Sequence, residues 1–158
     1  MHKNFVALLL GLLLVAGSIA AQAQLVAPVI PDTPASRIFR LWLDALNDDD
    51  RNKLREFYKT YNPSHMDWAD SDADLARGTS GFDLLKVVES TPTKFTVLLQ
   101  ARDSDDFVRS MLLVTKSAPY TITGFLLMPT QRPPEFALPH LSQDALLSQL
   151  KDRLQRES

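Results

Sequence analysis

The sequence contains no cysteine among its 158 residues. Disulfide bonds, thiolate nucleophiles and thiolate metal sites are therefore excluded, and so is a lipid anchor attached to a cysteine at a cleavage point. Histidine is also scarce, because only His65 and His140 remain beyond the first few residues. A zinc site would need ligands from distant parts of the chain. We accordingly predict no metal site and no cofactor.

An excess of positive charge is also lacking. The chain has 17 basic and 19 acidic side chains, a formal charge of −2. Removal of residues 1–23, which include Lys3, leaves 16 against 19, a formal charge of −3. Nothing in this balance attracts nucleic acid or anionic lipid, so we predict no nucleic-acid partner and no membrane binding by the mature chain.

Only one long apolar run exists, and it lies at the N-terminus between Phe5 and Ala16. Its length of about 12 residues is shorter than the ~20 residues that a membrane-spanning helix needs. Small residues follow as far as Ala23, with Ala20 as a second cleavage point. This pattern is typical of a cleaved secretory signal peptide over residues 1–23 and predicts an exported protein, periplasmic or extracellular.

The remaining chain of about 135 residues is long enough for one domain with one core. A proline-rich leader over residues 24–33 ends at Thr33, which with Pro34 is typical of a helix start. A second helix, capped by Asp49 or Asp50, ends at Asn62 and the proline that follows it. Apolar residues recur at intervals of three and four residues in both helices, which predicts one apolar face on each. They are Ile38, Phe39, Trp42, Ala45 and Leu46 in the first helix and Leu54, Phe57, Tyr58 and Tyr61 in the second.

The polar segment from Ser64 to Gly81 predicts a loop, with one helical turn over Ala73–Arg77. Four strand-like blocks follow, and turns as short as those between them permit only an antiparallel meander. The third and fourth blocks are apolar on both sides, which predicts that they form the centre of the sheet. The blocks are Phe82–Ser90, Thr93–Arg102, Asp106–Lys116 and Tyr120–Pro129.

A second proline-rich stretch over residues 132–141 predicts a linker, and Ser142 then caps a C-terminal helix over 142–158. Its apolar stripe predicts packing against its own domain or against a partner: Leu146, Leu147, Leu150 and Leu154. The predicted fold class is therefore α+β, a domain over residues 34–131 with N-terminal helices packed on a curved four-stranded antiparallel sheet. The C-terminal amphipathic helix is added to this domain.

No catalytic motif is complete. Ser148 and Lys151 fit the S-x-x-K pattern, but K-T-G and S-D-N are missing. The run Asp70–Asp74 imitates the opening of a calcium loop, yet Leu75 replaces the required glycine and Gly81 the required glutamate. We therefore assign no catalytic residue and favour a protein that is not an enzyme.

The order of elements over residues 33–139 resembles the nuclear-transport-factor-2-like (cystatin-like or SnoaL-like) α+β cone domains. Three segments look like parts of the non-catalytic domain that accompanies secreted β-lactamase-like serine hydrolases and tail-specific proteases. They are Gly81–Leu84, Glu89–Thr93 and Pro134–Pro139. The resemblance implies helices on the concave face of the sheet and an accessory role beside a serine hydrolase.

Cone domains of this kind hold small molecules between the sheet and the helices, in apolar cavities that present carboxylates and a tyrosine. The resemblance implies a pocket for an apolar ligand lined by Trp42, Phe57, Tyr58, Tyr61 and His65. The second block contains no carboxylate, and neither does the third block from Phe107 onward. Aromatic stripes at helical spacing also fit an ordinary core.

Three functional hypotheses follow. The leading one is a secreted non-catalytic binding domain for a protein, a peptide or an apolar ligand, in support of a serine hydrolase. The second is a small-molecule isomerase or hydrolase that uses Tyr61, His65 or Asp67 at the mouth of the cone. The third is a remnant of a larger serine hydrolase that lacks its catalytic domain. A protein partner or a second copy would bind through the sheet face or the C-terminal helix.

Overall fold

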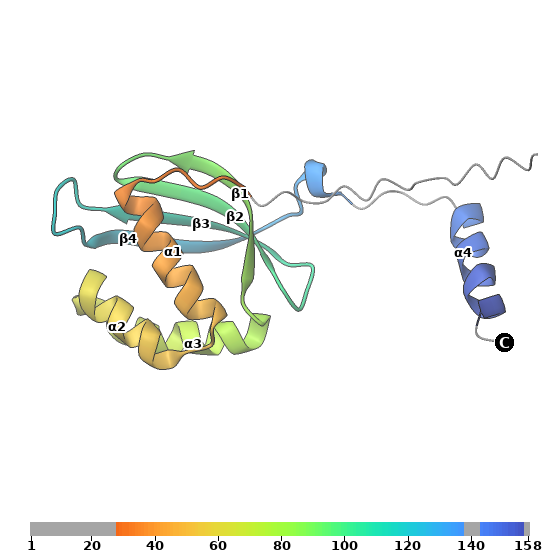
Figure 1. The fold of residues 1–158 in the computed structure, drawn as a ribbon, viewed down its shortest axis with the longest axis horizontal. Coiled ribbons are helices and arrows are strands. Elements are labelled where there is room, and N and C mark those ends of the chain that lie inside the picture. The colour runs from red at the N-terminus through yellow and green to blue at the C-terminus, as the bar shows by residue number, and fades with distance from the viewer. Residues whose placement is uncertain (1–27, 138–142, 157–158) are drawn as a thin grey trace, which may run out of the picture.

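The computed structural model describes residues 28–137 and 143–156, and helices precede strands in it (Figure 1). The predicted signal peptide and the predicted cap at Ser142 lie outside the described residues. The helices are α1 (Pro34–Asn47), α2 (Arg51–Tyr61), the short η1 (Pro63–His65), α3 (Trp68–Thr79), the short η2 (Pro134–Phe136) and α4 (Gln143–Arg156). The strands are β1 (Phe82–Ser90), β2 (Lys94–Ala101), β3 (Phe107–Val114) and β4 (Ile122–Thr130).

Side-chain caps define where the first two helices begin. The Thr33 hydroxyl accepts a hydrogen bond from the Ser36 amide at 3.2 Å, and the Thr33 amide donates to the Ser36 hydroxyl at 2.9 Å. At α2 the carboxylate of Asp50 accepts from the amides of Asn52 and Lys53. Of the two predicted caps for α2, Asp50 is therefore the right one, while Asp49 turns the chain with a positive φ of 49°.

The predicted loop between residues 64 and 81 is wrong for most of its length, because α3 occupies it, and only the predicted helical turn over Ala73–Arg77 is confirmed, as part of α3. Three small side chains spaced three or four apart, Ala69, Ala73 and Ala76, are all buried in the core formed with α1 and α2. Their small size lets the helix backbones approach closely, which polarity alone does not reveal. Gly81 then ends the connection with a φ of 86°, which favours glycine.

The four strands form one antiparallel sheet in the order β1-β2-β3-β4. The predicted strands are confirmed to within two residues at each end. The predicted position of β4 is wrong, because β4 is an edge strand and its Leu126 and Met128 are 48% and 42% exposed. Two bulges in β1, after Leu84 and after Val87, bend this strand.

Helix α1 lies across one face of the sheet, and α2 and α3 pack beside it (Figure 1). The core fills the space between α1 and the sheet: the Phe39 ring lies 5.3 Å from that of Phe95, and the Trp42 ring 4.7 Å from that of Phe125. The predicted α+β class and the predicted apolar faces of the first two helices are confirmed. Helix α4 stands apart from the sheet (Figure 1).

Within the described residues, none of the helices has the length and apolar character needed to cross a membrane.

Candidate functional site

The structure places the five predicted pocket residues in three different locations. Trp42 and Tyr58 lie in the core and are at most 1% exposed. Phe57 and Tyr61 line a cleft on the outside of the helices. His65 lies in η1, where its ring centroid is 4.5 Å from that of Trp68. The predicted residues therefore do not surround one cavity.

Two of these residues meet Asp72, which the sequence analysis did not single out. The indole Nε1 of Trp42 donates to Asp72 Oδ2 at 2.6 Å, and the Tyr58 hydroxyl donates to the same oxygen at 2.5 Å. We call Trp42, Tyr58 and Asp72 the inner cluster. Because its members come from α1, α2 and α3, the inner cluster ties the three helices together.

Burial governs the electrostatics of the inner cluster. It raises the pKa of the Asp72 carboxyl above its usual range, while the hydrogen bonds from Tyr58 and Trp42 partly offset this rise. Burial and the neighbouring carboxylate also raise the pKa of the Tyr58 phenol, so Tyr58 remains a hydrogen-bond donor. With Asp72 only 9% exposed, the inner cluster is suited to holding helices together rather than to exchanging protons with a ligand.

The sequence did carry a signal for Asp72. Residues 69, 72, 73 and 76 have the i, i+3, i+4, i+7 spacing of one helical face, and Asp72 shares that face with three alanines. The other two acidic side chains of the run, Asp70 and Asp74, point away and pair with Arg51. The resemblance to a calcium loop therefore fails, because these residues lie in a helix.

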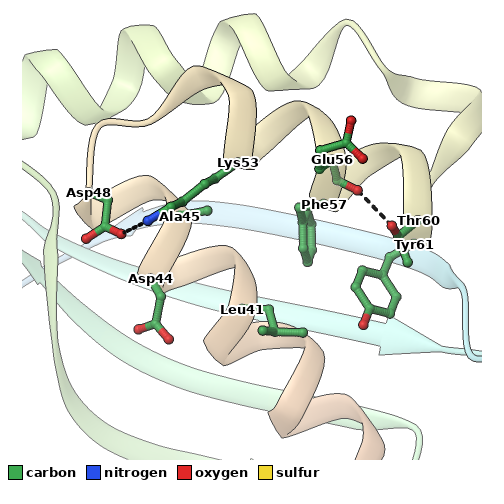
Figure 2. Close-up of a pocket in the computed structure, with 9 residues that line it drawn as sticks. All are labelled: Leu41, Asp44, Ala45, Asp48, Lys53, Glu56, Phe57, Thr60 and Tyr61. Carbon is green, nitrogen blue, oxygen red and sulfur yellow. Dashed lines mark hydrogen bonds and ion pairs between the residues drawn. The ribbon is translucent and has the colours of Figure 1, made fainter.

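A cleft of about 360 Å³ lies between α1 and α2 (Figure 2). Leu41 of α1 faces Phe57 and Tyr61 of α2 across it (Figure 2). A second cleft of about 280 Å³ shares Leu41, Thr60 and Tyr61 with the first and continues toward Tyr120 in the β3–β4 connection. We call the two clefts together the α1–α2 groove. Its lining residues are Pro34, Arg37, Ile38, Leu41, Asp44, Ala45, Asp48, Lys53, Glu56, Phe57, Thr60, Tyr61, Pro119 and Tyr120.

The α1–α2 groove has an apolar floor and, in the first cleft, a mainly acidic rim. Leu41 is 49% exposed on this floor. The rim has three carboxylates, Asp44, Asp48 and Glu56, but a single ammonium, that of Lys53. Lys53 Nζ lies 2.6 Å from Asp48 Oδ2, and this hydrogen bond raises the pKa of Lys53. No ion pair involves Asp44 among the described residues.

Two further features lie away from the groove. Ser148 and Lys151 of the S-x-x-K match are both exposed on α4. Across residues 28–137 and 143–156, no three His, Asp or Glu side chains are grouped so that they could hold a metal ion.

No family model, curated protein or solved structure matches this chain significantly. The site is therefore interpreted from its geometry and chemistry.

Proposed function

We propose that this protein is an exported, non-catalytic binding domain whose α1–α2 groove takes an apolar segment of a partner polypeptide. One observation carries the proposal: the aromatic side chains of the described core pack against one another, while the apolar floor of the groove is open. Phe39 and Trp42 are fully buried against the sheet. Leu41, which lies between them in the sequence, is half exposed in the groove. Exposed apolar surface of this kind marks interaction sites.

The rim of the groove specifies the chemistry of the partner. Its carboxylates outnumber its ammonium groups in the first cleft, and Lys53, which pairs closely with Asp48, also interacts with Asp44 at longer range. A lysine or arginine next to an apolar side chain would complement this arrangement. The two connected clefts run along α1, and this elongated shape suits a segment of polypeptide better than a single small molecule.

The isomerase or hydrolase alternative has less support. Tyr61 faces the groove, while His65 contacts Trp68 and Asn62 instead. The acid and the tyrosine that such chemistry uses occur together in the inner cluster, but there they are buried and bonded to each other. A general base must reach its substrate.

We further propose that the chain is related to the nuclear-transport-factor-2-like cone domains and acts beside a secreted serine hydrolase. The helix-first order and the four-stranded meander support the relationship. The apolar leader in the sequence supports export.

The test is selection of a random peptide library against the purified mature chain. We expect the selected peptides to combine a leucine or aromatic residue with a lysine or arginine. Leu41→Glu should weaken their binding at least about tenfold, because it places a charge on the apolar floor. Met66→Glu is the control, since Met66 is 38% exposed but lies outside the groove. Peptides that bind both variants equally well would refute the proposal.

A further inference from the structure

Strand alternation gives the sheet a second apolar face, opposite α1. In β2 and β4 the core residues Val97, Phe125 and Leu127 alternate with residues that point the other way. The register aligns these into rows across the sheet: Thr96, Met111 and Leu126 form one row, and Leu98, Arg109 and Met128 form the next. We call these six residues, with Phe107 and Leu113, the outer sheet face.

The chain itself returns across this face after β4. The Arg132 guanidinium lies 5.3 Å from the centre of the Phe107 ring, and the Phe136 ring lies 6.1 Å from it. Glu135 Oε1 then pairs with Lys86 Nζ at 2.8 Å, and Lys86 is opposite Leu98 in the register. The segment therefore passes from β4 over β3 to β1, and its η2 turn is fixed on the outer sheet face.

The outer sheet face is buried on β2, where Thr96 and Leu98 are 6% and 4% exposed, and next to η2, and it is most open along β4. Phe107, next to η2, is 4% exposed, whereas Leu126 and Met128 remain close to half exposed. Exposed apolar residues that lie side by side, unlike scattered ones, indicate a surface that another element covers. Arg109 is the charged residue of the two rows within β2, β3 and β4, and the rows continue onto β1 with Glu89 and Lys86. The aliphatic stem of Arg109 can lie under a helix while its guanidinium stays in water.

Helix α4 is an element with a matching surface and a short tether. Leucines at 147, 150 and 154 share one side of the helix by their spacing. Leu147 and Leu150 are 56% and 57% exposed. Six residue steps from Ala137 to Gln143 reach at most about 22 Å. A 14-residue helix is about 21 Å long, comparable with the ~26 Å length of an eight-residue strand.

We propose that α4, which stands apart from the sheet in Figure 1, docks on the outer sheet face of its own chain, with its leucine side over Leu126 and Met128. The anchor at η2 delivers the chain to this face, and the tether keeps α4 near it at a high effective concentration. A second copy would have to compete with this local helix. The inference is independent of the α1–α2 groove, which α4 leaves open.

Cysteine cross-linking tests this docking directly, because the chain has no cysteine of its own. Leu126→Cys would be combined with Leu147→Cys in one variant of the mature chain and with Leu150→Cys in another. Leu41→Cys with Leu150→Cys is the control, because Leu41 is as exposed as Leu126 but lies in the groove. After mild oxidation, intact mass and non-reducing electrophoresis separate bonds within a chain from bonds between chains.

We expect a disulfide within one chain for at least one Leu126 pair and none for the Leu41 pair. Disulfides only between chains would show that a second copy covers the face, and would overturn the proposal. Absence of a disulfide in both Leu126 pairs, or equal yield in the control, would overturn it too.

A second measurement needs no cross-link. The double variant Leu147→Asp with Leu150→Asp should lower the thermal midpoint by several degrees, because it removes the apolar contacts of α4. Ser148→Asp with Gln155→Asp adds the same charge to exposed positions of this helix and should leave the midpoint nearly unchanged. Equal shifts in the two double variants would contradict the docking.

Discussion

The inner cluster and the α1–α2 groove share helices α1 and α2 but differ in what they offer a ligand. The inner cluster contains a buried carboxyl group that accepts hydrogen bonds from a buried phenol and a buried indole. The groove contains ordinary surface charges around an open apolar floor (Figure 2). In this protein the acid and the tyrosine, residue types that often act in catalysis, hold the helices together. The accessible apolar surface of the groove is the candidate binding site.

The largest effect that we expect is on stability, from Asp72→Ala. This change leaves two buried donors unpaired, the Trp42 indole and the Tyr58 hydroxyl. Each unpaired buried donor costs about 1 to 3 kcal/mol, so the free energy of unfolding should fall by about 2 to 6 kcal/mol in urea titrations. Asp74→Ala, on the exposed side of α3, is the matched control and should cost about 0 to 1 kcal/mol. Similar losses for both variants would mean that the inner cluster does not hold the helices.

A smaller effect should appear in the pH dependence of stability. Burial raises the pKa of Asp72 in the folded state above its unfolded value. Between these two values the folded protein binds more protons, so the contribution of Asp72 to stability falls as pH rises through this window. Asp72→Asn removes this titration. The free energy of unfolding of the wild type minus that of Asp72→Asn should therefore decrease from about pH 4 upward, whereas a flat or rising difference would contradict a raised pKa.

Charge at the rim of the groove should have the smallest effect. Asp44→Lys should weaken the binding of a basic selected peptide several-fold at low salt, because it reverses an exposed negative charge on the rim of the groove. The loss should shrink as salt is added. Asp103→Lys makes the same change in net charge in the β2–β3 hairpin and should leave affinity nearly unchanged. Fluorescence anisotropy titrations at two salt concentrations would measure both variants, and equal losses would point to net charge rather than the groove.

Much of the fold follows from local patterns. The caps at Thr33 and Asp50 and the alternation in the strands locate two helices and the sheet. The sequence pattern does not predict helix α3, because its buried face consists of alanines and one aspartate, and such small and polar residues are also typical of loops. The edge position of β4 could not be predicted either. Apolar residues on both sides of a strand fit a central strand and also an edge strand of a sheet with two apolar faces.

The candidate site follows much less from the sequence. Phe57 and Tyr61 belong to the predicted pocket and do line the groove, but Trp42 and Tyr58 face inward. The periodic pattern does not predict that Leu41 is exposed, because its exposure depends on the distance between α1 and α2 at that turn. Such spacing between helices is set by tertiary packing, which the sequence pattern does not encode.

The most direct test of the central claim compares one variant from each region in the same binding titration. Tyr58→Phe removes a hydroxyl from the inner cluster, and Leu41→Glu changes the floor of the groove. We predict that Tyr58→Phe binds a selected peptide with wild-type affinity, while Leu41→Glu loses at least about tenfold, or ~1.4 kcal/mol. Unchanged binding by Leu41→Glu together with a large loss for Tyr58→Phe would contradict the assignment of binding to the groove and of structure to the inner cluster.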